Sequence, residues 1–176
     1  MASMSRIALV AALLITACTA PTATMSPDTP DDLAILAGSV FEEFIGAFPA
    51  RAACIGEVQI GGSWELSDRA RYHPADRRIE VRIPATAPHL TASLVHELGH
   101  HLEHACPEQV DIRSSFLVAL DLEPDTDWRD DSAYETTPSE LWAEAVVRHV
   151  TGETDTRRPL PVTQGAVRVV AEWAEG

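Results

Sequence analysis

The stretch LVHELGHHLEH, residues 94–104, is the part of the chain around which the rest is organised. It contains the pattern H-E-x-x-H, with His96, Glu97 and His100 in the defining places. Residues four apart lie one turn above each other on the same face of a helix, so the two imidazoles can bind one Zn²⁺ through ring nitrogens. Glu97 is one step round the helix, beside the water that such a metal activates. It is therefore a candidate general base.

The apolar residues of this stretch predict a helix at the edge of a core. Leu94, Val95, Leu98 and Leu102 repeat at helical spacing and can bury one side. Gly99 costs about 1 kcal/mol relative to Ala inside a helix, so we expect it to have a packing reason. The alternative is a solvated helix that happens to be rich in His and Glu, and it leaves the apolar face unexplained.

A third metal ligand must follow His100, because a catalytic zinc usually has three protein ligands and one position for water. The extended spacing H-E-x-x-H-x-x-G-x-x-H is not present, since Glu103 and Cys106 stand where Gly and the third His would be. His101 points about 100° away from the ligand face. His104 could ligate only if the helix bent.

A second segment, SELWAEA at residues 139–145, offers a carboxylate ligand. With H-E-x-x-H upstream, it resembles the E-aromatic-aromatic-A-E segment of zinc peptidases with a Glu ligand (gluzincins), including the lethal-factor-like group. Leu141 replaces the first aromatic. Carried over residue by residue, the resemblance implies Glu140 as third ligand and Glu144 as the carboxylate that orients a ligand His. A Tyr upstream of this helix stabilises the oxyanion in that family, which points to Tyr134.

Simpler explanations exist for two of these residues. Thr137 and Glu140 also have the spacing of a capping box, so Glu140 could simply close the N-terminus of its helix. Glu144 would then be the next candidate ligand. Tyr134 could be an ordinary surface or packing residue, and Tyr72 is a weaker candidate for the same role.

The first residues have the composition of a targeting segment. Arg6 precedes the apolar run 7–15, which is too short to span a bilayer. The sequence ITAC, ending at Cys18, resembles a bacterial lipobox. It predicts a signal peptide over residues 1–17 and a lipid on Cys18. The alternative is plain secretion, with cleavage at a small-residue site.

The remaining pattern predicts an α+β fold. Residues 18–30 are rich in Thr, Pro, Ala and Ser and predict a disordered tether, so that one domain covers 31–176. Alternating apolar and polar residues predict strands over 54–60 and 77–83, with a turn at Gly61-Gly62. We expect a small, mostly antiparallel sheet packed with the motif helix and the Glu-ligand helix. The resemblance implies a minimal zincin-like domain.

Charge and cysteine content constrain partners and compartment. The chain has 27 Asp and Glu against 13 Lys and Arg, a formal net charge of −14, which argues against nucleic acid and against electrostatic attachment to anionic lipid. Of three cysteines, Cys18 is assigned to the lipid. Cys54 and Cys106 remain, in a chain bound for an oxidising compartment, and predict one disulfide. Two buried free thiols are the alternative.

These features predict a monomeric zinc metallopeptidase outside a bacterial cell, tethered to the membrane through Cys18, or secreted if the lipobox interpretation is wrong. Zn²⁺ would be held by the two motif histidines and the downstream Glu. The strand at 77–83 would lie along the cleft and pair with an extended protein or peptide substrate. The alternative is a catalytically silent zinc-binding or adhesion lipoprotein. Glu97 argues against it, because a pure binding site would not need that residue.

Overall fold

The computed structural model describes residues 20–129, 133–152 and 160–176. The predicted signal peptide and Cys18 lie outside these residues, so the expectations for them stay predictions. In chain order the elements are β1 (Thr22–Met25), α1 (Asp31–Ala47), η1 (Pro49–Arg51), α2 (Ala52–Ile55), β2 (Glu57–Ser63), β3 (Ala70–His73), β4 (Arg78–Arg82), α3 (Ala87–Ala105), η2 (Pro107–Ile112), α4 (Arg113–Ala119), η3 (Tyr134–Thr136), α5 (Pro138–Thr151) and α6 (Gln164–Glu175).

The four strands form one mixed sheet in the order β1-β2-β4-β3. β2 pairs in parallel with both β1 and β4, and only β3 and β4 are antiparallel. The α+β class is confirmed, but the expectation of mostly antiparallel pairing is wrong. The order in which the chain visits the strands gives the reason. Helix α1 connects β1 to β2, which lets these two strands run parallel. The chain then goes to β3 at the far edge and returns as β4 between β3 and β2, so β4 is antiparallel to β3 and parallel to β2.

Two segments near the start of the sheet differ from the sequence-based expectation. Thr22–Met25 is a strand where composition predicted a disordered tether, because its backbone pairs along the edge of β2. Gly61 and Gly62 lie within β2 rather than in a turn. A Cβ on Gly61 would be 2.6 Å from Ser26 Oγ, and one on Gly62 would be 2.8 Å from Leu33 Cδ2. The two glycines therefore allow the close approach of β1 and α1.

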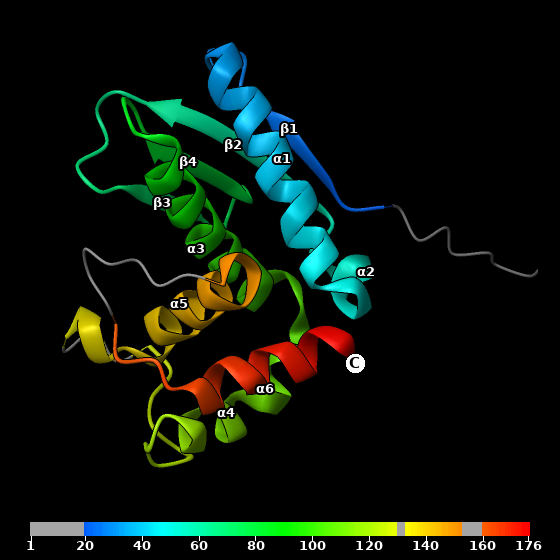
Figure 1. Ribbon diagram of the computed structural model, residues 1–176, viewed down its shortest axis with the longest axis vertical. Coiled ribbons are helices and arrows are strands. Elements are labelled where there is room, and N and C mark those ends of the chain that lie inside the picture. Colours follow the sequence, from blue (N-terminus) through cyan, green and yellow to red (C-terminus); the bar gives the residue numbers. More distant parts are fainter. Residues whose placement is uncertain (1–19, 130–132, 153–159) are drawn as a thin grey trace, which may run out of the picture.

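Helices α1 and α3 cover the sheet, with α1 over β1 and β2 and α3 over β4 and β3 (Figure 1). Val58 and Ile60 of β2 and Ile79 and Val81 of β4 are fully buried at alternate positions, as a half-buried strand requires. Within the described ranges no single helix is long and apolar enough to cross a bilayer. Only α1 joined to Pro49–Ile55 reaches that length and apolarity, across a bend of 95°.

A helical layer of α4, α5 and α6 packs beyond α3 (Figure 1). Trp142 of α5 is its centre, with no exposed surface and with the rings of Phe116 and Trp173 each 5.5 Å away between centroids. The predicted disulfide is confirmed, since Cys54 and Cys106 are bonded with their Cα atoms 5.1 Å apart. It joins the segment before β2 to the end of α3.

Helices α3 and α5 pack closely against each other at Gly99. A Cβ on Gly99 would be 3.0 Å from Ala143 Cα and 3.4 Å from Val146 Cβ. The indole Nε1 of Trp142 donates a hydrogen bond to the Gly99 carbonyl at 3.1 Å. The expected packing reason for this glycine is therefore confirmed, because the missing side chain lets the two helix backbones meet. This contact brings the first turn of α5 beside the middle of α3.

We expect Gly99→Ala to lower the free energy of unfolding by about 1 kcal/mol. Overpacking of a core costs about 1–3 kcal/mol, which exceeds the gain of up to about 1 kcal/mol in helix propensity. The matched control is Gly38→Ala in α1, where a Cβ would meet nothing within 4 Å. That control should gain about 0.5–1 kcal/mol. Urea unfolding measures both, and equal stabilisation of both variants would contradict the packing role of Gly99.

Candidate metal centre

His96 and His100 lie one turn apart on the side of α3 that lines the cleft, as the motif predicted. Their ring centroids are 5.0 Å apart, and the two side chains are only 14% and 16% exposed. The opposite side of α3, which includes Leu94, Leu98 and Leu102, is fully buried. Core packing therefore fixes the helix orientation that directs both imidazoles into the cleft between α3 and α5.

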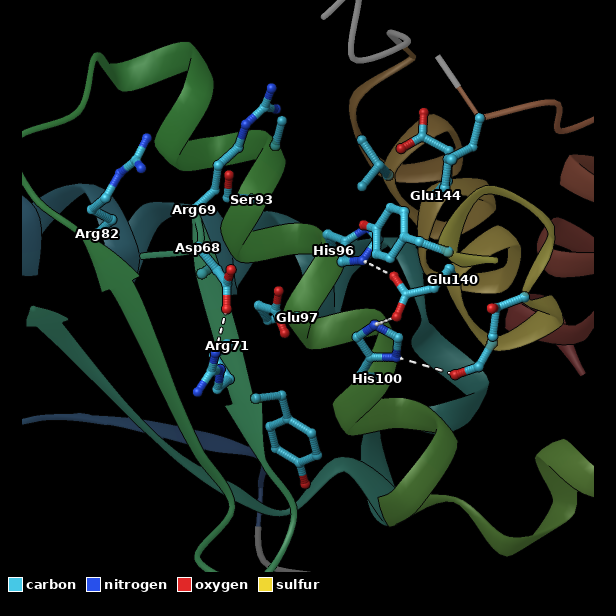
Figure 2. A pocket seen from close by; sticks show the side chains of 18 of the residues that line it. Asp68, Arg69, Arg71, Arg82, Ser93, His96, Glu97, His100, Glu140 and Glu144 are labelled. Carbon is cyan, nitrogen blue, oxygen red and sulfur yellow. Dashed lines mark hydrogen bonds and ion pairs between the residues drawn. The ribbon is translucent and has the colours of Figure 1, made fainter. Parts of the chain in front are cut away.

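Glu140, in the first turn of α5, completes a three-donor group with the two histidines (Figure 2). Its carboxylate oxygens lie 3.0 Å from His96 Nε2 and 3.5 Å from His100 Nε2. One ligand atom from each residue lies within 4.8 Å of the other two. Two imidazole nitrogens and a carboxylate oxygen are a common donor set for catalytic zinc, although other transition metals accept the same ligands.

The capping-box explanation of Glu140 does not hold. Thr137 is the N-cap residue of α5, but its side chain makes no capping hydrogen bond. The Thr137 hydroxyl instead donates to the Ala133 carbonyl at 3.0 Å. The Glu140 carboxylate points to the histidines rather than back to the helix end. The helix is started by Pro138 at its first position, which needs no hydrogen-bond partner.

The carboxylates around the two histidines favour positive charge in this group. Burial lowers the pKa of His100, but the carboxylates of Glu103 and Glu140 outweigh burial and raise it to about 10. Burial opposes ionisation of Glu140, but hydrogen bonds from His100 and His96 outweigh it and hold its pKa well below the usual range. Protons and a metal ion compete for the same imidazole lone pairs, so metal binding here would release protons.

Glu103 supports His100 from behind, a role that the sequence analysis did not assign to it. Its side chain is 1% exposed, and one oxygen accepts a hydrogen bond from Ser139 Oγ at 2.6 Å. His100 Nδ1 lies 3.4 Å from the same Oγ and 3.7 Å from the Glu103 carboxylate. A proton held on Nδ1 leaves Nε2 as the nitrogen that can bind a metal ion. The available signal was the i, i+3 spacing of His100 and Glu103.

Two arginines neutralise the buried Glu103 carboxylate. Arg129 Nη2 donates to it at 2.8 Å, and Arg113 Nη2 lies 3.8 Å away. Burial raises the pKa of Glu103, but its bonds to His100 and Ser139 and the nearby positive charges outweigh burial and lower it to about 2. Glu103 is therefore ionised at neutral pH and keeps His100 oriented.

Glu97 projects into the same cleft but is not part of the three-donor group. Figure 2 shows it between the ligand residues and the ion pair of Asp68 and Arg71. The side chain is half-buried. A carboxylate placed beside a metal site without ligating it can accept a proton from water, which agrees with the role predicted for Glu97.

The other predicted residues of the site occupy different positions. Tyr134 lies in η3 at the rim of the cleft and is 47% exposed, and its assignment to the oxyanion stays a prediction. Glu144 lines the cleft one turn after Glu140, with its carboxylate 3.5 Å from Arg148 Nε. Its support of a ligand His also stays a prediction. The residue seen beside His100 is Glu103.

His101 and His104 are not members of the three-donor group. His101 is fully buried, and its Nε2 donates to the Ile55 carbonyl at 2.8 Å while Nδ1 accepts from the Tyr72 hydroxyl at 3.0 Å. Burial lowers the pKa of His101 to about 4, so the ring is neutral. His104 Nε2 accepts from Arg129 at 2.9 Å. Tyr72 therefore links β3 to α3 through His101, and its weaker candidacy for the oxyanion stays a prediction.

The cleft has a volume of about 920 Å³ and is bounded by β3, α3 and the start of α5. Residues 67–72 form one wall. The expectation that the strand at 77–83 lies along the cleft and pairs with substrate is wrong, because β4 is paired with β2 on one side and β3 on the other. β3 takes that place as the edge strand of the sheet.

No protein-family model, curated protein or solved structure matches this chain. The resemblance to Glu-ligand zinc peptidases therefore rests on residues 96–100 and 139–145 alone. What these residues can do follows from their geometry and chemistry rather than from the fold.

Glu140→Gln should reduce zinc affinity by more than about 100-fold, the upper end for loss of an outer-shell partner. An uncharged amide is a poorer ligand than a carboxylate. The matched control is Glu135→Gln, an exposed residue of the preceding turn, which should bind zinc like the wild type. Zinc content after dialysis against a weak chelator measures the effect. Full zinc retention by Glu140→Gln would remove Glu140 from the site.

Glu103→Gln should weaken zinc binding by about 10–100-fold, because His100 loses the charged group that orients it. The same substitution at Glu144 tests the alternative assignment and should have a smaller effect. Competition with a chromophoric chelator gives both affinities. A larger loss in Glu144→Gln than in Glu103→Gln would show that Glu144 is the supporting carboxylate.

Proposed function

We propose that this chain is an extracytoplasmic zinc-dependent peptidase. The observation that carries the proposal is a single cleft that contains both the three-donor group and a separate carboxylate, Glu97. His96, His100 and Glu140 would hold the ion. Three protein ligands with a nearby unligated Glu match the requirements of a hydrolytic zinc site.

The chemistry divides between the ion and the residues around it. When bound, zinc supplies Lewis-acid chemistry that acidifies water and polarises a carbonyl oxygen. Glu97 accepts a proton from the water that attacks the peptide carbonyl and then passes it to the departing amine. Tyr134, at the rim, donates a hydrogen bond to the carbonyl oxygen as negative charge develops there.

The edge strand β3 supports the choice of a peptide as substrate. No strand in the described part of the chain pairs with its outer edge. The Arg82 amide donates to the Arg69 carbonyl at 2.8 Å, and hydrogen-bonded pairs alternate along an antiparallel ladder. The backbone groups of Ala70 and Tyr72 therefore face outward, where an extended peptide can pair with them.

The compartment follows from cysteine chemistry and the N-terminal pattern. The Cys54–Cys106 disulfide supports an oxidising environment outside the cytoplasm. Lipidation of Cys18 would hold the monomer at the bacterial membrane surface, and secretion is the alternative if the lipobox interpretation fails. Both arrangements give the cleft access to extracytoplasmic protein or peptide substrates.

Glu97→Gln should retain one zinc per chain and lose at least about 100-fold in turnover, because it removes the proton acceptor and leaves the ligands intact. The matched control is Glu172→Gln, exposed on α6, which should leave turnover unchanged. Hydrolysis of a reduced, alkylated protein substrate and metal analysis are the two measurements. Unchanged turnover in Glu97→Gln would show that another group takes the proton.

The rival function is a zinc-binding or adhesion protein without turnover. The same assays separate the two. Wild-type protein that holds zinc in the site but cleaves no unfolded protein or peptide would favour the binding protein and contradict the peptidase.

A further inference from the structure

Arg129 is an exposed residue with a buried ionic partner. It lines the cleft, and its side chain is 57% exposed. Its Nη2 group donates a hydrogen bond to the Glu103 carboxylate at 2.8 Å and another to His104 Nε2 at 2.9 Å. The Glu103 side chain is only 1% exposed. A surface charge is therefore held in a close, charge-assisted contact with a carboxylate inside the protein.

Glu103 connects Arg129 to the metal group. The two oxygens of its carboxylate have different partners, since Oε1 accepts from Arg129 and Oε2 accepts from Ser139 Oγ at 2.6 Å. Oε2 is also the oxygen that lies 3.7 Å from His100 Nδ1. The last torsion of a glutamate side chain has a broad range when nothing restrains it. The bond from Arg129 to Oε1 restricts this rotation and keeps Oε2 directed to the histidine.

The residue before Arg129 contacts the other half of the site. The Trp128 carbonyl accepts a hydrogen bond from the Ser139 amide at 3.1 Å, in the turn of α5 that carries Glu140. The Trp128 side chain is buried, with its ring centroid 6.3 Å from that of Trp142. Core packing therefore fixes the backbone from which Arg129 extends. Together the two residues contact both helices that supply metal ligands.

Arg113, the other arginine near Glu103, has a different set of contacts. Its Nη2 lies 3.8 Å from Oε1 of Glu103, which is beyond hydrogen-bond distance. Its Nε donates to Gln109 Oε1 at 2.8 Å, and its guanidinium lies 4.5 Å from the centroid of the Trp128 ring. The close contacts of Arg113 are thus with η2 and the aromatic core. The short hydrogen bond to the carboxylate comes from Arg129.

We propose that Arg129 is a positioning residue for the metal group, which acts through Glu103 to set the direction of the His100 ring. The proposal rests on the proposed zinc site and adds to it a residue that neither motif segment contains. Partners outside the ligand shell orient ligand histidines and change metal affinity without touching the ion. Substitution of an exposed residue usually has little effect, so a loss of affinity at Arg129 is informative.

The zinc affinity of Arg129 variants tests this role without relying on turnover. In competition with a chromophoric chelator, Arg129→Gln should bind zinc about three- to tenfold more weakly than the wild type. This loss is smaller than the one expected for Glu103→Gln, because Arg129 is one contact further from the ion. Arg129→Lys should recover part of the affinity, since lysine keeps the charge but lacks the planar donor group.

The matched control is Arg168→Gln, an exposed residue of α6 outside the cleft, which should bind zinc like the wild type. Urea unfolding of each zinc-free variant checks that it still folds cooperatively. If Arg129→Gln does not fold, Arg129→Lys carries the test and should bind zinc about twofold or more weaker than the wild type.

A double-mutant cycle shows whether Arg129 acts through Glu103. In the Glu103→Gln background, the further change Arg129→Gln should alter zinc affinity by less than about twofold, because the carboxylate that Arg129 holds is absent. Two losses that simply add would contradict this route. The cycle also separates positioning from a general electrostatic effect of Arg129, which would persist without Glu103.

Zinc affinity of Arg129→Gln equal to that of the wild type would overturn the positioning role and leave the zinc site in place. Turnover assays keep this result separate from the proposed function. Wild-type protein that binds zinc and loses affinity on Arg129→Gln, but cleaves no peptide, refutes the peptidase and leaves the role of Arg129. Wild-type protein that binds no zinc in this cleft refutes both.

Discussion

The contact between Gly99 and Ala143 sets the geometry on which the candidate site depends. The two α3 histidines and the α5 glutamate come from separate helices, and the separation of those helices fixes the distances between their donor atoms. A side chain at Gly99 would meet the Ala143 backbone at 3.0 Å. The buried indole of Trp142 holds the same crossing through its bond to the Gly99 carbonyl. The candidate metal site is therefore positioned by core packing rather than by a loop.

The sequence predicted the local elements well and their pairing poorly. The sequence predicts α3 and α5 as helices because each helix is specified by its own residues. β1 was missed, since its four residues are stabilised by pairing with β2 rather than by apolar side chains. The parallel pairing of β2 with β4 depends on where β3 goes, which is a tertiary choice that local alternation does not encode.

For the site, the sequence predicted the residues that carry a motif and missed the one that depends on tertiary contacts. His96, Glu97 and His100 follow from one helix turn, and Glu140 follows from the resemblance of its segment to the Glu-ligand peptidases. Glu103 was missed because its role requires Ser139 and Arg129, which come from distant parts of the chain. Sequence spacing cannot show that a carboxylate is buried with such partners.

The central claim is that His96, His100 and Glu140 bind one zinc ion at the crossing of α3 and α5. The most direct measurement is anomalous diffraction at the zinc edge from crystals of zinc-loaded protein. We predict one strong peak at about 2.0–2.2 Å from an Nε2 atom of each histidine and from a carboxylate oxygen of Glu140. A zinc peak bound through His104 or Glu144 in place of Glu140, or no peak in this cleft, would contradict the claim.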